Sequence, residues 1–200
     1  MIYEALYEFD AQLRAERGIF CGVDEAGRGP LAGPVCCAAC ILPEDVRIDG
    51  LNDSKKITEK KRELLFDEIR EKASAFNIVF IDSGTIDEIN ILAATMLGMK
   101  QAVEGLPVPP SFAAIDGNRV PDLGISAESF VKGDGRSASI AAASVLAKVS
   151  RDRLMREYAL QYPQYGFEQH KGYGTKQHYE AIAKYGVLPI HRRTFLKGIV

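Results

Sequence analysis

The chain of 200 residues lacks both the long apolar runs and the leader that would connect it with a membrane or with export. No stretch reaches the about 18 consecutive apolar residues that a membrane-spanning helix needs. Residues 1–18 are charged throughout and have neither the basic start nor the apolar middle of a secretory signal. We therefore expect a soluble, cytoplasmic protein that forms one domain, or one domain with a small appendage.

Cysteine is also scarce, with Cys21, Cys36, Cys37 and Cys40 as its four examples. Cys36 and Cys37 are adjacent, so they would point to opposite faces of a strand. No second CxxC pair and no histidine lies nearby to complete a zinc site. This spacing predicts small buried thiols in a reducing compartment.

The familiar phosphate-binding loops are absent as well. The segment "GRGPLAG" carries Gly27, Gly29 and Gly33, but Pro34 stands where a Walker loop needs Lys followed by Ser or Thr. A dinucleotide fingerprint needs a helix to start within the loop, whereas Pro30 and Pro34 bracket a segment that leads into another strand. Glycines let the backbone approach a ligand closely, so the exposed amides are candidates for binding a sugar or a phosphate. Arg28 would add a charge-assisted contact.

What the chain does have is an uneven distribution of charge. Residues 1–147 hold 15 Lys and Arg against 23 Asp and Glu, a net charge of −8, and residues 148–200 hold 10 against 4, a net charge of +6. All three histidines also lie in the second part. The basic part could grip a polyanion that the acidic part processes, or it could be an ordinary solvated helical surface; both interpretations stay open.

The pattern of apolar residues predicts alternating strands and helices. Strands are expected at residues 19–24, 34–43, 76–83, 111–117 and 128–134. Helices are expected from about Thr58 onward with Leu64, Leu65 and Ile69 as the apolar stripe, from a capping box at Thr85 and Glu88 to Gly105, over residues 137–162, and over a short segment ending at Gly186. This order predicts an α/β protein with a mixed sheet covered by helices.

Four carboxylates fall at the ends of predicted strands. Asp24 and Glu25 close the first, and Asp116 and Asp134 close the last two. If these ends meet, the like charges would raise one another's pKa unless a cation compensates them. Mg²⁺ and Mn²⁺ prefer oxygen ligands, and a carboxylate cage with two such ions about 4 Å apart hydrolyses phosphodiesters. Each acid taken alone could equally be a turn residue beside glycine.

These features leave three classes of function. A phosphate-binding nucleotide hydrolase lacks the Lys-Ser/Thr that should follow its glycines. A non-catalytic nucleic-acid module has no use for four acids that would repel its ligand. A metal-dependent enzyme acting on nucleic acid uses both the acids and the basic second part.

Seven segments in chain order, from about residue 19 to residue 195, form a specific set. They are "GVDEAGRGPLAGPV", "GLNDSKKIT", "INILAATMLGM", "AAIDGNRVP", "VKGDGRSASIAAASVLAKVSRD", "YPQYGFEQHKGYGT" and "HRRTF". Together they resemble bacterial ribonuclease HII, the type 2 ribonuclease H family. The type 3 relative carries an additional N-terminal domain, for which the residues before the first predicted strand are too few.

The resemblance implies a ribonuclease H-like fold, with a five-stranded mixed sheet flanked by helices and a helical C-terminal extension. On this basis we expect an N-terminal extension at residues 1–18, the catalytic domain at 19–160, and a substrate-binding loop and helical extension at 161–200. It implies a monomer whose partners are RNA–DNA hybrids and ribonucleotide-containing duplex DNA.

The resemblance also implies the activity and the site. The family cleaves the RNA strand of hybrids and nicks on the 5′ side of single ribonucleotides embedded in duplex DNA, leaving a 3′-hydroxyl and a 5′-phosphate. Its metal-binding acids match Asp24, Glu25, Asp116 and Asp134, which would hold Mn²⁺ or Mg²⁺. Its ribose-contacting turn matches Gly27, Arg28 and Gly29, and the tyrosine that meets the 2′-hydroxyl and the next deoxyribose matches Tyr173. One departure stands beside Asp134, because Gly135 occupies a position where most relatives have Ser.

Several further residues are candidates for phosphate contact. Lys55 and Lys56 precede a predicted helix, and could equally be solvated. Lys132 precedes Asp134 by two residues, so it is expected to share that strand face and reach the phosphate. His191 is expected to have a structural or phosphate-binding role, because a metal-activated hydroxide needs no histidine base.

Overall fold

The computed structural model describes residues 2–54 and 57–198 and has a five-stranded mixed sheet at its centre. The strands lie in the order β3-β2-β1-β4-β5, with β1 in the middle. Their bounds are Phe20–Ala26 (β1), Val35–Ile41 (β2), Ala75–Ile81 (β3), Phe112–Asp116 (β4) and Ser126–Phe130 (β5). The strands β1, β2 and β3 pair antiparallel, whereas β4 runs parallel to both β1 and β5. The predicted mixed α/β sheet is confirmed.

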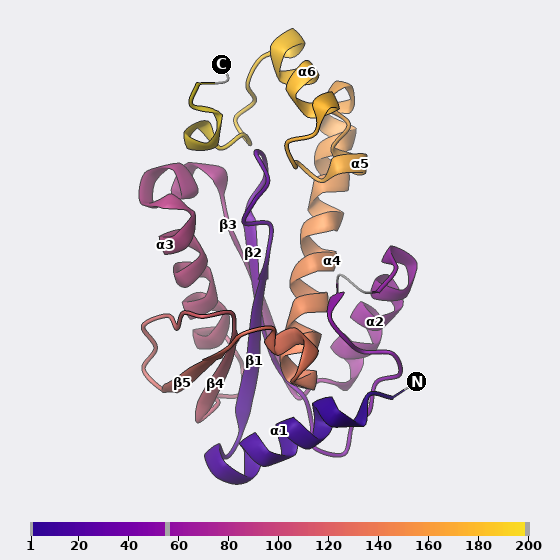
Figure 1. Ribbon diagram of the computed structural model, residues 1–200, viewed down its shortest axis with the longest axis vertical. Coiled ribbons are helices and arrows are strands. Elements are labelled where there is room, and N and C mark those ends of the chain that lie inside the picture. Colours follow the sequence, from indigo (N-terminus) through magenta and orange to yellow (C-terminus); the bar gives the residue numbers. More distant parts are fainter. Residues whose placement is uncertain (1, 55–56, 199–200) are drawn as a thin grey trace.

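Helices cover both faces of this sheet, as Figure 1 shows in a nearly edge-on view. Their bounds are Glu4–Arg17 (α1), Glu59–Lys72 (α2), Ser83–Glu104 (α3), Ala138–Gln161 (α4), Phe167–His170 (α5) and Lys176–Tyr185 (α6). The long helix α4 lies on one face with α1 and α2, and α3 lies on the other. The segment with α5 and α6 sits at the far end of α4 (Figure 1). No helix in the described part of the chain is long and apolar enough to cross a membrane.

Strand β2 is buried on both faces because it lies between two helical layers. Cys36 and Cys40 pack toward α4 and α2, and Cys37 packs toward α3. All four cysteines are free and buried, and burial raises the pKa of Cys36, Cys37 and Cys40. The sequence prediction of buried thiols is confirmed.

The small residues at the start of α4 allow the helix to lie almost against the backbone of β1. A Cβ placed on Gly22 would come within 2.2 Å of the Ile140 amide nitrogen, which no side chain could tolerate. The Ala- and Ser-rich stretch of α4 therefore packs directly on the sheet. Ser137 caps this helix by accepting a hydrogen bond from the Ile140 amide at 3.2 Å.

Two details of the predicted helices are wrong. Leu64 is 65% exposed, because the buried face of α2 runs through Leu65, Phe66 and Ile69. Helix α3 starts before the predicted capping box, since the carboxylate of Asp82 accepts a hydrogen bond from the Thr85 amide at 2.8 Å. An Asp that ends a strand serves as an N-cap as well as a Thr three residues later, and sequence spacing alone does not separate the two.

Candidate functional site

The central strand β1 carries the first two acidic residues of the candidate site. Asp24 and Glu25 pair with Ala38 and Cys37 of the neighbouring strand β2. On the other side, β1 runs parallel to β4 in a register that pairs Val23 with Ile115, so the next position on each strand brings Asp24 beside Asp116. Parallel pairing thus brings together two acids that are far apart in sequence.

The electrostatics of Asp24 reflect this crowding. Its side chain is buried, and burial together with the negative charges of Glu25 and Asp116 holds its pKa well above the usual range. The Glu25 amide donates to Asp24 Oδ1 at 2.7 Å, and hydrogen bonding from Ser144 also opposes the rise. The ionised form of this cluster calls for a compensating positive charge.

Asp134 is buried beside this cluster but reaches it by a different route from the one predicted. Strand β5 ends at Phe130, and Asp134 lies in a 3₁₀ turn, η2 (Gly133–Gly135). The carboxylate of Asp116 fixes the turn, because its Oδ1 accepts hydrogen bonds from the amides of Gly133 at 2.7 Å and Asp134 at 3.3 Å.

The expectation that Lys132 shares a strand face with Asp134 is therefore wrong. Lys132 has a left-handed backbone with φ of 56°, and its side chain is exposed. Because Lys132 has a left-handed backbone and Gly133 begins the turn, the strand alternation ends before Asp134, and a spacing of two residues no longer predicts a shared face. Lys55 and Lys56 lie outside the described residues.

The acids form a group rather than a finished cage. Across residues 2–54 and 57–198, no three Asp, Glu, His or Cys side chains converge closely enough to hold one ion. The donor set is still the one that hard divalent cations prefer, because it consists of carboxylate oxygens.

The glycine turn follows β1 directly and is held by a buried arginine from the C-terminal segment. Arg192 donates to the carbonyl oxygens of Gly27 at 2.6 Å, Arg28 at 2.8 Å and Gly33 at 3.0 Å. Its side chain is inaccessible to solvent, and burial and the charge of Arg151 lower its pKa to about 9, so it remains charged at neutral pH. Because the carbonyls of the turn are engaged on this side, the shape of the turn is fixed from behind.

A second buried arginine, Arg151 of α4, holds the next part of the same loop. Its guanidinium donates to the carbonyl oxygens of Pro34 at 2.9 Å, Ala32 at 3.0 Å and Lys171 at 3.0 Å. Gly27 has φ of +90°, and a Cβ on it would lie 1.9 Å from Arg151 Nε. Glycine is required at position 27 both by the backbone conformation and by the close approach of this arginine.

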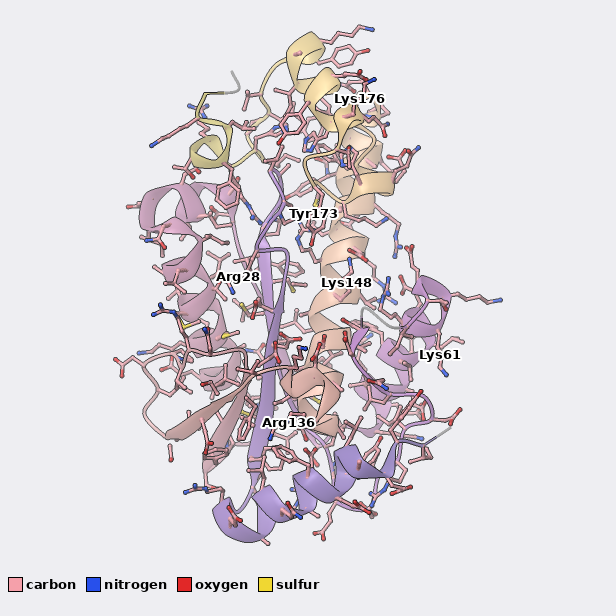
Figure 2. The ribbon with its side chains drawn as sticks, in the orientation of Figure 1. Arg28, Lys61, Arg136, Lys148, Tyr173 and Lys176 are labelled. Carbon is pink, nitrogen blue, oxygen red and sulfur yellow. The ribbon has the colours of Figure 1, made fainter. Side chains whose placement is uncertain are left out.

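Tyr173 comes from the loop between α5 and α6 and packs over the glycine turn. A Cβ on Gly29 would lie 3.6 Å from Cε1 of the tyrosine ring. Its side chain is 46% exposed, so one side of the ring remains available to a ligand. Figure 2 shows Tyr173 and Lys148 between β1 and α4, and Arg28 beside β1.

These groups enclose one cavity of about 330 Å³. Its lining residues come from β1, the glycine turn, α4 and two loops: Asp24, Glu25, Ala26, Gly27, Arg28, Gly29, Ser54, Ser144, Lys148, Arg151 and Tyr173. Asp116 and Asp134 do not line the cavity itself. Asp116 lies close enough to Asp24 for its charge to raise the Asp24 pKa, and it accepts a hydrogen bond from the Asp134 amide. Arg28 is half-exposed and lies 3.6 Å from Glu25.

Several of these residues were missed by the sequence analysis. Lys148 reaches the cavity from α4 with its ammonium 2.7 Å from Asp152, and Ser144 and Ser54 share a hydrogen bond of 2.8 Å between their hydroxyls. The sequence contained one indication that Arg151 and Arg192 matter, because each lies inside one of the motifs shared with the family. Nothing in the sequence indicated which carbonyls they would bind.

Residues 148–200, the basic part of the chain, had two possible interpretations: a surface that binds a polyanion, or an ordinary solvated helical surface. The structure shows that many of its arginines are engaged within the protein. Arg151 and Arg192 are buried and bind backbone carbonyls. Arg153 and Arg156 of α4 form ion pairs with Glu63 of α2. Lys148 lines the cavity, and its ammonium also pairs with Asp152. The net charge of this part therefore overstates what is available to a polyanion.

Comparisons with known proteins agree on one family. The model of the ribonuclease HII family matches residues 21–197. A ribonuclease HII of Acetivibrio thermocellus is 55% identical over 195 residues, covering 98% of this chain and 76% of the relative. A ribonuclease HII of Caldicellulosiruptor saccharolyticus is 50% identical over 200 residues, covering 100% of this chain and 98% of the relative.

Solved structures show the same fold. The crystal structure of ribonuclease H2 from Pyrococcus horikoshii superposes with a TM-score of 0.74 at 27% identity, covering 90% of this chain and 96% of that one. The predicted ribonuclease H-like fold is confirmed. The chain belongs to the ribonuclease HII family, and it is a divalent-metal-dependent ribonuclease H that acts on RNA–DNA substrates.

Proposed function

We propose that this ribonuclease H cuts the RNA strand of hybrids and also nicks duplex DNA on the 5′ side of a single embedded ribonucleotide, leaving a 3′-hydroxyl and a 5′-phosphate. The observation that supports this most strongly is that the acid pair, the glycine turn and Tyr173 line one cavity. A scissile phosphate placed at the acids then has its ribose beside the turn and the tyrosine.

We assign the metal-binding role to Asp24, Glu25, Asp116 and Asp134, with Mg²⁺ or Mn²⁺ as the ions. The raised pKa of Asp24 supports this, because it arises from burial and from the charges of two neighbouring acids, which a cation would compensate. When bound, two such ions would supply an activated water and stabilise the leaving oxygen. Asp116 has the further task of holding the η2 turn, and with it Asp134, next to the cluster.

We assign ribose recognition to the backbone of Gly27, Arg28 and Gly29 together with the hydroxyl of Tyr173. The 2′-hydroxyl is both a donor and an acceptor, and it is the group that distinguishes RNA from DNA. Since the guanidinium of Arg192 occupies the carbonyls of the turn from inside, the turn keeps one shape and does not adapt to a sugar that lacks the hydroxyl. The tyrosine ring packs against the following sugar, where a deoxyribose leaves more room than a ribose.

The division of the chain follows from this assignment. Residues 19–160 form the catalytic part. Residues 161–200 contribute to substrate binding through Tyr173 and through Arg192, the arginine clamp that holds the glycine turn. All of these groups come from one chain, so a monomer suffices for the reaction. We propose Lys55, Lys132 and Lys148 as phosphate contacts that do not depend on base sequence.

The catalytic assignment is tested with Asp24→Asn. We expect the variant to lose Mg²⁺- and Mn²⁺-dependent nicking of a duplex with one ribonucleotide while it still binds that duplex. Asp122→Asn, an exposed acid in the loop before β5, is the matched control and should cleave normally. Cleavage retained by Asp24→Asn would exclude the metal site proposed here. Loss of binding together with cleavage would contradict the prediction that the carboxylate acts in catalysis and not in binding the duplex.

The junction role is tested with Tyr173→Ala. We expect a larger loss of activity on a single embedded ribonucleotide than on a long hybrid, because only the first substrate places a deoxyribose against the ring. Tyr3→Ala removes an exposed tyrosine far from the cavity and serves as the control. An equal loss on both substrates would exclude the junction role of Tyr173, without bearing on the assignment of the catalytic acids.

A further inference from the structure

Behind Tyr173 lies a cluster of three histidines that the proposed chemistry does not use. His170 and His178 stack with ring centroids 4.5 Å apart, and His178 and His191 follow at 5.2 Å. All three side chains are buried. They come from α5, from α6 and from the segment before η4 (Arg193–Leu196), so the cluster joins the parts of the C-terminal region.

The hydrogen bonds of this cluster fix the position of every proton. A backbone N–H can only donate, so the Leu188 amide, 2.9 Å from His191 Nδ1, requires that nitrogen to be unprotonated. His191 then carries its proton on Nε2 and donates to His178 Nε2 at 3.0 Å. His178 must carry its own proton on Nδ1, which lies 2.9 Å from the Tyr173 carbonyl.

The groups at both ends of this chain of hydrogen bonds are consistent with one donor-to-acceptor direction, from Leu188 to Tyr173. The Tyr173 carbonyl can only accept and the Leu188 amide can only donate, and one pair of neutral tautomers satisfies both. A proton added to His178 would bring two N–H groups face to face at its 3.0 Å contact with His191. A proton added to His191 would instead set its Nδ1–H against the Leu188 amide N–H, 2.9 Å away.

The relay connects Tyr173 with the loop that follows the glycine turn. His191 forms a β-bridge with Ala32, and the Arg192 amide donates to the Leu31 carbonyl at 2.8 Å, in the loop that continues the glycine turn. His178 binds the carbonyl of Tyr173 at the other end. The third histidine holds the same loop, since His170 Nδ1 accepts from the Gly172 amide at 3.2 Å.

We propose that His178 and His191 are positioning residues that couple the glycine turn to Tyr173 through a relay of two neutral imidazoles, and so set the preference for an embedded ribonucleotide. This inference rests on the proposed ribose-sensing role of Tyr173. The relay acts on the backbone of residue 173 and leaves the acid group alone. It therefore affects discrimination between substrates more than the chemical step.

The relay predicts a dependence of discrimination on pH. Burial is the main reason why the pKa of His178 and of His191 is lowered to about 4, and the neighbouring histidine adds to it. The titratable groups packed on the pair are His170, stacked on His178, and Tyr165, whose ring lies 5.6 Å from that of His191; Phe167 fills the remaining side. Near pH 7 the relay is intact, and acidification toward pH 4 breaks it.

The first test reads the tautomers directly by ¹⁵N NMR of the whole protein at pH 7. We expect the Nδ1–H form of His178 and the Nε2–H form of His191. Any other pair of tautomers overturns the relay, whatever the activity of the enzyme. This measurement needs no substrate and no metal, so its outcome is independent of the proposed function.

The second test compares kcat/KM on a single-ribonucleotide duplex with kcat/KM on a long hybrid. We expect His178→Phe to lower this ratio about five- to tenfold, the effect of one lost buried hydrogen bond at the recognising residue. His178→Asn places an amide N–H near the Nδ1 position and should restore part of the ratio. Glu180→Gln, an exposed change on the same helix, should leave it unchanged.

A double variant separates the two possible failures. In the Tyr173→Ala background, His178→Phe should lower the ratio no further. A ratio that falls in Tyr173→Ala but not in His178→Phe rejects the relay alone, whereas an unchanged ratio in Tyr173→Ala rejects the junction role on which it rests. For the wild type, the ratio should stay constant between pH 7 and pH 5 and fall as the pH approaches 4, where His178 and His191 take up protons. Loss of carboxylate charge affects both substrates alike and cancels in the ratio, so a ratio that stays constant down to pH 4 contradicts the relay.

Discussion

The clearest quantitative prediction concerns Arg192, the buried arginine that holds the glycine turn. Substitution Arg192→Met keeps most of the side-chain volume but removes three hydrogen bonds, to the carbonyls of Gly27, Arg28 and Gly33 at 2.6, 2.8 and 3.0 Å. Arg192→Lys keeps the charge but offers a compact ammonium in place of the planar fork, so it can satisfy one of the three carbonyls well.

The magnitude follows from the burial of these groups. A buried carbonyl left without a donor costs about 1–3 kcal/mol. The lower end applies here, because Gly27 and Arg28 also line the cavity and water can reach them. Removing a buried guanidinium recovers part of its desolvation penalty. We therefore expect Arg192→Met to lose about 2–4 kcal/mol of unfolding free energy, and Tm to fall by about 5–15 °C for a chain of this size.

The assay combines urea or thermal unfolding with cleavage of the single-ribonucleotide duplex well below the lowered Tm. Loss of the turn geometry should reduce kcat/KM by about ten- to a hundredfold even where the variant is fully folded. Arg193→Met is a matched control, since its side chain is exposed and the change in charge is the same. That control should stay within about 0.5 kcal/mol of the wild type.

The reasoning is refuted if Arg192→Met and Arg193→Met behave alike in both assays, because the carbonyl contacts would then contribute neither to stability nor to the turn. If Arg192→Lys has the same unfolding free energy and the same kcat/KM as the wild type, the planar fork geometry of the guanidinium is unimportant. A stable Arg192→Met protein with reduced cleavage would mean that the clamp serves the site and not the fold.

Three further predictions follow from particular contacts. Gly27→Ala should lose more than about 2 kcal/mol of stability, because φ is +90° and the new Cβ would meet Arg151 Nε at 1.9 Å; urea unfolding checks this, and a neutral result would contradict the local geometry. Gly135→Ser should fold and cleave like the wild type and gain about 0.5 kcal/mol, since a Cβ there meets no atom within 4 Å; a loss of cleavage would show that the glycine itself is needed beside Asp134. The unfolding free energy should rise with pH between about 4 and 6.5, because the unfolded state binds more protons at His178 and His191 than the folded state does; the slope should be shallower in His178→Phe, and an equal slope would place the pH dependence elsewhere.

The sequence by itself determined the alternation of strands and helices, the buried cysteines and the place of the first acid pair. These are local properties, because a strand buried between two layers of helices reads as an apolar run and Ser137 caps a helix whatever lies around it. The motifs also indicated the family, and with it the fold. Local patterns failed where two local solutions were equally good, as for the start of α3 and for the exposed Leu64.

Only the tertiary structure decided which distant groups meet. The pairing of β1 with β4 puts Asp116 beside Asp24, and the carboxylate of Asp116 then holds the turn that carries Asp134. No periodicity in the sequence encodes that a C-terminal arginine will bind the carbonyls of an N-terminal turn. Such contacts depend on strand order and on how helices pack across the sheet, because these set the distances between segments that are more than a hundred residues apart.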